Sequence, residues 1–190
     1  MTSERRNLWL AVGAVAAVQA AVLGWMIFER AHLLASGREV VLEVVPVDPR
    51  SLFRGDYVIL GYDMSRIDGA AGAPSPKRGD DIYVTLQKGE ADKWKVAASG
   101  PEPPATTAAD QVVLKGRVDY ATAASGQTPA QTFVHYGIES FFVPEGAGRE
   151  LEALVREKKL SALIAVDGDG NAGIKGLIVD GKRVYEEPLL

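Results

Sequence analysis

Residues Leu8–Phe28 read LWLAVGAVAAVQAAVLGWMIF, an apolar run that only the amide of Gln19 interrupts. A helix rises about 1.5 Å per residue, so one of this length spans about 30 Å, the thickness of a bilayer's hydrocarbon core. Trp9 and Trp25 lie near the two ends, where indole rings favour the headgroup region. The run predicts a single transmembrane helix, and the rest of the chain is then a domain held at a membrane surface.

A cleaved secretory signal is the alternative to an uncleaved anchor. Arg5 and Arg6 precede the apolar run, as basic residues do in a signal peptide. Such a signal, however, has an apolar core of roughly 7–15 residues followed by a small-x-small cleavage site. This run is longer, and Ala35-Ser36-Gly37 matches such a site poorly. We favour an uncleaved anchor, which divides the chain into a tail at 1–7, an anchor at 8–28, a connector at 29–37 and a domain at 38–190.

The charges on the two sides of the apolar run favour an N-terminus inside the cell. Arg5, Arg6 and the terminal amine precede the run, whereas Arg30 and Arg38 follow it. Positive residues near an anchor tend to stay on the cytoplasmic side. We therefore expect a single-pass protein of the bacterial inner (plasma) membrane, with its C-terminal domain on the periplasmic or extracellular side.

The composition past the anchor is that of one ordinary, mildly acidic domain. About 150 residues follow the anchor, a length typical of single domains. The whole chain has 21 basic and 25 acidic residues, a net charge of −4 and no basic block. Nucleic-acid binding requires a concentrated positive patch, so we expect no nucleic-acid partner.

Short segments with strand character, separated by glycine- and proline-rich loops, make up most of the domain. One amphipathic helix is expected at 148–159, and Gly137 is expected to form a bulge within a strand. Asp180-Gly181 is typical of a tight hairpin turn. The pattern predicts a mainly β fold of the α+β kind, an antiparallel barrel or sandwich with one helix, after the transmembrane helix. The expected strands are 38–47, 56–64, 81–88, 94–99, 112–120, 133–143, 160–166, 173–179 and 183–185.

A short motif follows the first strand of the domain. The stretch Gly55–Tyr62 reads G-D-Y-x-x-L-x-Y. It resembles the signature of the GDYXXLXY family of membrane-anchored proteins, and Tyr136–Glu145 and Ile174–Lys182 also look like segments of that family. The resemblance implies a small bacterial membrane-anchored protein, sometimes encoded beside a multipass membrane protein. It implies no particular activity.

The motif allows a structural and a functional interpretation. In the structural one, the glycine takes a turn conformation, the aspartate accepts backbone hydrogen bonds in that turn, and one tyrosine buries its ring. The two tyrosines fall on opposite faces of a strand. In the functional one, charged residues form a cluster with the motif on one rim of the domain. The residues that this interpretation assigns to a motif or interaction site are Arg50, Arg54, Gly55, Asp56, Tyr57, Leu60, Tyr62 and Glu139.

The segment that contains the motif also resembles part of the pattern of type I signal peptidases, which are likewise membrane-anchored and β-rich. Alignment of Leu52, Gly55 and Asp56 with that pattern places Val47 where the nucleophilic serine would stand. Acyl transfer cannot proceed without that hydroxyl group. A distant shared scaffold stays open, but a shared reaction is not expected.

Metal-binding and histidine-dependent sites have little support in the sequence. His32 and His135 are the only histidines, too few for a three-histidine zinc site. Residues 167–171 read DGDGN, like the start of a calcium loop, but Ala172 and Ile178 stand where that loop needs glycine and glutamate. We expect a turn there, no metal and no cofactor.

Together these features favour a non-enzymatic binding or assembly module of the cell envelope that works with a membrane partner, such as a multipass membrane protein. No catalytic residues are identified. One alternative is an envelope hydrolase that uses rim carboxylates such as Asp56 or Glu139 on a distant signal-peptidase-like scaffold without its serine. The other is a small-ligand sensor. A deep pocket that gathers Asp56, Glu139 and His135 would favour the hydrolase.

Overall fold

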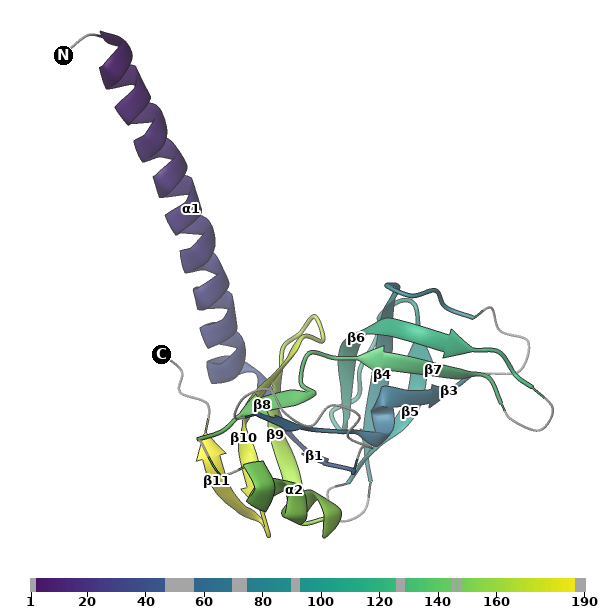
Figure 1. Cartoon of the computed structure of the whole chain (residues 1–190). Coiled ribbons are helices and arrows are strands. Elements are labelled where there is room, and N and C mark those ends of the chain that lie inside the picture. The colour runs from purple at the N-terminus through teal and green to yellow at the C-terminus, as the bar shows by residue number, and fades with distance from the viewer. Residues whose placement is uncertain are drawn as a thin grey trace.

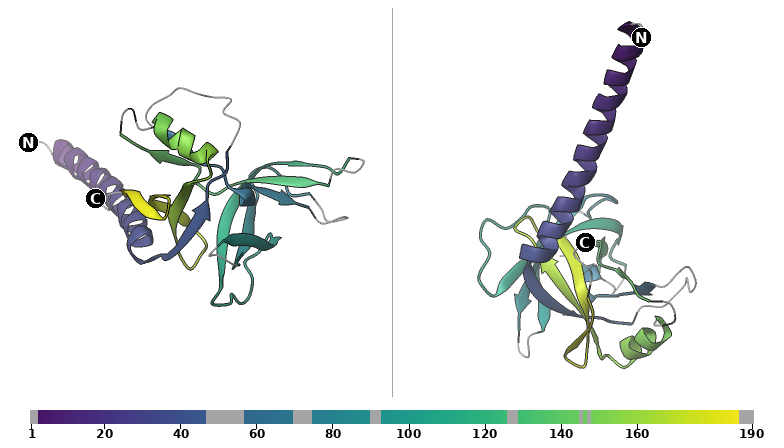
Figure 2. Two further views of the ribbon diagram at one scale, coloured as in Figure 1. Left: turned by 90° about the horizontal axis from the view of Figure 1, so that it is seen from below. Right: turned by 90° about the vertical axis from the view of Figure 1, so that its left-hand side faces the viewer.

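A long N-terminal helix projects from a β-rich domain in the computed structural model (Figure 1). The structure describes residues 3–46, 57–69, 75–89, 93–125, 129–144, 146 and 148–186. The helix leaves the domain on one side, and the strands drawn in teal lie on the opposite side (Figure 2, left). The mainly β fold preceded by an apolar helix, which the sequence predicts, is confirmed.

Helix α1 (Ser3–Ser36) is apolar on all sides along most of its length. The large apolar side chains between Trp9 and Phe28 are each at least half exposed. Residues Trp9–Ser36 are long and apolar enough to cross a membrane, and none of the most apolar window is buried in the protein. Residues 29–36, which follow the apolar run, continue the helix to the edge of the domain.

The end of this helix packs against a four-stranded antiparallel sheet. Its order is β1-β9-β10-β11, with β1 (Arg38–Glu43), β9 (Leu160–Val166), β10 (Ala172–Val179) and β11 (Lys182–Glu186). The turn between β10 and β11 is the predicted tight hairpin, because Asp180 and Gly181 have φ values of 47° and 79°.

A five-stranded antiparallel sheet lies on the far side of the domain from α1 (Figure 1). Its order is β3-β7-β6-β4-β5. The strands are β3 (Arg66–Asp68), β7 (Gln131–His135), β6 (Gln111–Thr122), β4 (Asp81–Lys88) and β5 (Trp94–Gly100).

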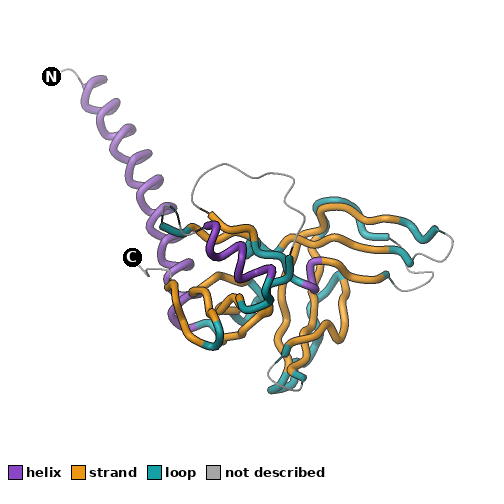
Figure 3. Tube along the Cα trace, turned by 60° about the horizontal axis from the view of Figure 1, so that its bottom comes forward, coloured by secondary structure: helices purple, strands orange, loops and turns teal. Residues whose placement is uncertain are grey.

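Strands β2 (Tyr57–Ile59) and β8 (Ser140–Phe142) form a short antiparallel pair of their own. Helix α2 (Gly148–Arg156) packs beside β2 and β9 (Figure 3). A 3₁₀ turn, Asp63–Ser65, leads into β3. The sheets together form a nearly closed, barrel-like arrangement around one hydrophobic core. Its largest fully buried side chains are Leu60, Leu86, Leu114, Ile138, Leu151, Leu160, Ile164 and Leu177.

Several predicted element boundaries are wrong. The strand expected at 56–64 ends at Ile59, and the chain then passes into the five-stranded sheet. The strand expected at 133–143 is two strands, β7 and β8, in different sheets. Gly137, with a φ of 78°, lies in the turn between them and not in a bulge. Between 57 and 64 the alternation of buried residues continues through the crossing, so periodicity does not reveal where that strand ends. In 133–143 the spacing of buried residues changes from two to three between Ile138 and Phe141, which marks the crossing.

Candidate functional site

Tyr62, the last residue of the motif, is buried where the chain crosses between sheets. Its side chain is 4% exposed, and its hydroxyl donates a hydrogen bond of 2.8 Å to the carbonyl oxygen of Ile138. Burial raises the pKa of the Tyr62 phenol, and the nearby carboxylate of Glu139 raises it further. The phenol is therefore a neutral hydrogen-bond donor at physiological pH.

Tyr136 makes the reciprocal contact. Its hydroxyl donates a hydrogen bond of 2.8 Å to the carbonyl oxygen of Met64, and its side chain is 6% exposed. Burial raises the pKa of this phenol too, again with a smaller contribution from Glu139. Tyr62 thus bonds the turn between β7 and β8, and Tyr136 bonds the segment that follows the motif. We call this pair the tyrosine lock.

Glu139 closes the turn between β7 and β8. Its Oε1 accepts a hydrogen bond of 2.6 Å from the backbone N–H of Tyr136, and its carbonyl oxygen accepts one of 2.9 Å from Leu60 N–H. The side chain is only 21% exposed. Its position therefore supports the structural interpretation of the motif more than a role on an open rim.

The second carboxylate oxygen of Glu139 faces His135. Nδ1 of His135 lies 3.0 Å from Oε2, but without the geometry of a hydrogen bond, so this buried oxygen has no hydrogen-bond partner among the described residues. The contact is an ion pair only when the imidazole is protonated. Because the His135 side chain is 55% exposed, solvent screens that pair.

Four of the predicted site residues, Arg50, Arg54, Gly55 and Asp56, lie outside the described residues. The cluster that they were expected to form with Glu139 therefore stays a prediction. The structure describes the remaining motif residues Tyr57, Leu60 and Tyr62. Leu60 and Tyr62 lie in the core, and Tyr57 is half-buried.

Leu60 belongs to the core, with 1% of its side chain exposed. Tyr57 is half-buried, and its ring centroid lies 6.1 Å from that of Phe142 on the paired strand β8. Phe142 is 77% exposed. Neither Tyr136 nor Phe142 was among the predicted site residues, although the alternation of Val134, Tyr136 and Ile138 indicates that Tyr136 is buried.

The end of α1 is fitted closely to the four-stranded sheet. Leu33 and Leu34 are 8% and 3% exposed, and the Nη1 of Arg30 lies 3.5 Å from the carbonyl oxygen of Ala172 on β10. Gly37 alone separates the helix from β1, and its N–H bonds the carbonyl oxygen of Leu33. A Cβ atom at Gly37 would lie 2.5 Å from that oxygen. We call the contact between the end of α1, residues 30–37, and the four-stranded sheet the anchor joint.

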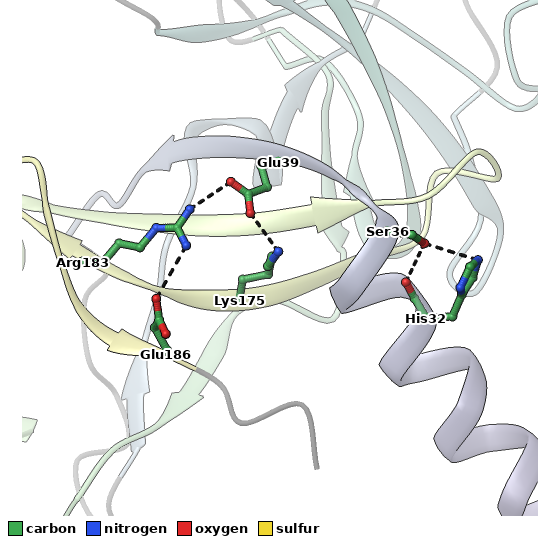
Figure 4. A network of polar contacts seen from close by, with 6 residues as sticks. All are labelled: His32, Ser36, Glu39, Lys175, Arg183 and Glu186. Atoms are coloured by element: carbon green, nitrogen blue, oxygen red, sulfur yellow. Dashed lines mark hydrogen bonds and ion pairs between the residues drawn. The ribbon is translucent and has the colours of Figure 1, made fainter.

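A network of charged side chains lies beside the anchor joint (Figure 4). Glu39 on β1 accepts hydrogen bonds of 2.8 Å from Lys175 on β10 and 2.9 Å from Arg183 on β11. The hydrogen bond from Lys175 is the main cause that holds the pKa of Glu39 below its ordinary value, and the charges of both cations add to it. Within the helix, Ser36 Oγ donates to the carbonyl oxygen of His32. The network ties β1 to β10 and β11 directly after the helix.

Arg38 ties the same end of β1 to the five-stranded sheet. Its Nη1 donates to the carbonyl oxygen of Gln111 and its Nη2 to that of Ala109, both at 2.6 Å. Its guanidinium also lies over the ring of Trp94, 5.6 Å from the centroid. Directly after the helix, Arg38 therefore bonds the five-stranded sheet and Glu39 bonds β10 and β11 of the four-stranded sheet.

Pockets and polar clusters elsewhere give no support to a hydrolase built on Glu139. Pockets of about 570, 420 and 570 Å³ are lined by described residues, and none of these three includes Glu139 or His135. Among the described residues, no group of three or more His, Asp or Glu side chains could hold a metal. Asp167 instead accepts the backbone N–H groups of Asp169 and Asn171, each at 2.9 Å, in the predicted turn.

Comparison with known proteins identifies a family. A family model described as GDYXXLXY protein matches residues 19–177, from within α1 to β10. No curated protein and no solved structure matches. The matched region includes both residues of the tyrosine lock and the whole anchor joint.

Proposed function

This chain belongs to the GDYXXLXY family, and from that premise we propose that it is a non-enzymatic binding or assembly module of the bacterial cell envelope. Helix α1 anchors it in the inner membrane, and the domain lies on the periplasmic or extracellular side. The domain binds a membrane partner, a multipass protein in the simplest case. The anchor joint is the observation on which the proposal depends.

The joint fixes both the height and the orientation of the domain. If the membrane span ends at Phe28, the eight helical residues 29–36 place the start of β1 about 12 Å beyond it. Leu33 and Leu34 are buried against the sheet, so the helix and the domain move together. A domain held in this way presents the same face to a neighbouring membrane protein at all times, which lowers the entropy lost when the two associate.

The alternative of a hydrolase is less well supported. Glu139 is the described carboxylate that this alternative names, and one of its oxygens is occupied by the backbone N–H of Tyr136. The other faces His135. A carboxylate that closes a turn and is partly covered is poorly placed to act as a general base on a substrate.

The test compares partner recovery with and without a flexible joint. The intact chain is extracted from native membranes in detergent and affinity-purified, and one stoichiometric membrane protein is expected with it. An insertion of about six Gly and Ser residues between Ser36 and Gly37 gives a flexible linker and should reduce recovery of that protein. The same insertion in front of Ser3 is the matched control and should not.

Two results would overturn the proposal. One is a chain that is monomeric in crosslinked native membranes, with no associated membrane protein. The other is equal partner recovery from both insertion variants, since the fixed joint would then have no role in binding. Release of the chain by carbonate washing would contradict the anchor itself.

A further inference from the structure

Neither edge strand of the five-stranded sheet, β3 or β5, pairs with a further strand among the described residues, and the two edges run in the same direction. Its order is β3-β7-β6-β4-β5, and every neighbouring pair is antiparallel. Strands β3 and β5 are therefore parallel to each other. Direct closure of the sheet would require a parallel pair, whereas a single inserted strand could pair antiparallel with both edges. Antiparallel pairing is the slightly more stable of the two.

One cleft lies between these two edges. Its volume is about 570 Å³, and it is lined by β3 from Arg66 to Asp68 and by β5 from Trp94 to Ser99. Apolar side chains of Leu42, Met64 and Leu86 also line it. The volume is in the range of sites that hold small ligands or short peptide segments. The cleft is thus bordered by unpaired strand edges, with apolar residues between them.

Strand β5 carries small apolar side chains that are exposed. Val96 lies opposite Leu86 on β4, and Leu86 is 1% exposed while Val96 is 40% exposed. Ala97 and Ala98, beside it, are exposed as well. Natural edge strands are usually protected by charges, proline or a covering segment. Here small apolar residues stand at the edge, and Lys95 is the charged residue next to Val96.

Charged side chains of both signs line the cleft: Arg66, Lys93 and Lys95 are basic, and Glu43, Asp63 and Asp68 are acidic. Lys95 on β5 and Arg66 on β3 are exposed and have no ion pair among the described residues. Lys93, by contrast, pairs with Glu43 at 2.8 Å. Asp63 and Asp68 line the β3 side, so the β5 side is the more basic one.

We propose that an extended segment of the membrane partner binds in this cleft as an added strand, antiparallel to both β3 and β5. Its apolar side chains alternate toward the exposed side chain of Val96, and a carboxylate among its outward side chains pairs with Lys95. This inference rests on the proposed function and adds to it the surface and the kind of segment that is bound.

The test uses the absence of cysteine from the chain, which lets one introduced thiol report on the cleft. Val96→Cys places that thiol in the cleft, and Val184→Cys, on the exposed edge strand β11, is the matched control at 52% exposure. Labelling by a maleimide–polyethylene glycol is compared between native envelopes and the purified full chain. For Val96→Cys we expect labelling about tenfold slower in envelopes, as if about 1.4 kcal/mol of binding covered the thiol, and for Val184→Cys an equal rate in both.

Each other outcome overturns the inference in a distinguishable way. Equal labelling of Val96→Cys in both preparations means that the cleft is open. Protection that persists in the purified monomer means that the chain itself covers it. Protection that accompanies a purified homodimer identifies a second copy as the occupant. If the partner co-purifies while the cleft is open, only this inference fails; if no partner is recovered at all, the proposed function fails too.

A charge reversal provides a second variant that leaves the core intact. Lys95→Glu changes an exposed residue, so the domain should fold and melt as before. We expect it to reduce partner recovery, because it opposes the carboxylate of the inserted strand. Lys182→Glu, an equivalent exposed change on β11, should leave recovery unchanged. Equal recovery from the two variants would contradict the assigned charge of the segment.

Discussion

Tyr62 and Tyr136 are hydrogen-bonded to each other's chain segments in opposite directions. The hydroxyl of Tyr62 donates to the carbonyl oxygen of Ile138, and the hydroxyl of Tyr136 donates to that of Met64, both at 2.8 Å. All four residues are buried. The final tyrosine of the motif therefore holds together two points at which the chain passes from one sheet to another.

The tyrosine lock should be measurable as stability. Tyr62→Phe or Tyr136→Phe leaves a buried carbonyl oxygen without its donor, and we expect each to lower the free energy of unfolding by about 1–3 kcal/mol. Tyr120→Phe, at a residue that is 52% exposed, is the control and should change it little. Denaturant titration of the detergent-solubilised chain measures all three. A neutral effect at both buried tyrosines would contradict the lock.

The space around the lock gives an independent prediction. A Cβ atom on Gly116 would clash with Val134 Cγ1 and lie 2.9 Å from Cε1 of Tyr136, whereas one on Gly168 would meet nothing within 4 Å. Gly116→Ala should therefore destabilise the domain by about 1–3 kcal/mol through overpacking. Gly168→Ala should be near neutral. Thermal melting of both variants checks the difference, and equal melting temperatures would show that the packing at Tyr136 is loose.

Alternating apolar residues predicted which motif side chains are buried, but not which sheet holds them. The two-residue spacing of Val58, Leu60 and Tyr62 places them on one face of a strand, and all three are below 5% exposed. The period of a strand reports which side faces the core, and at the crossing at 60–65 the two-residue spacing of buried side chains is unbroken, so periodicity could not reveal it. At 136–139 the spacing changes from two to three residues between Ile138 and Phe141, a signal that the single predicted strand overlooked.

The role of Glu139 shows a second limit of the sequence. Glu139 was expected within a strand at 133–143, in a charged cluster on one rim, and carboxylates are usually solvated. Its contact with the N–H of Tyr136 depends on the left-handed conformation of Gly137, which permits a tight turn. Glycine is common in turns and in bulges, so its presence did not distinguish the two.

The anchor joint should lose rigidity when its apolar contact is removed. Leu34→Ala truncates a side chain that is 3% exposed against the sheet, so we expect faster amide hydrogen exchange in residues 30–36 of the full chain. Leu23→Ala, at a position that is 60% exposed along the span, is the matched control and should leave that exchange unchanged. Unchanged exchange in both variants would mean that the helix end is held by the backbone alone.

The charged network at the joint should give the domain a pH-dependent contribution to stability. Because Lys175 and Arg183 lower the pKa of Glu39 in the folded state, the folded chain binds fewer protons at Glu39 than the unfolded chain does at the same acidic pH. The contribution is present above the ordinary pKa of 4.5 and is lost as the pH falls through the lower, folded value. The Glu39 side chain is 43% exposed, so solvent screening limits the effect to about 0.2–1 kcal/mol. Glu39→Gln should therefore melt below the parent chain at neutral pH, and the two melting temperatures should converge as the solution is acidified below pH 4.5. A difference that stays constant across that range would assign the effect of the substitution to packing and not to the charge of Glu39.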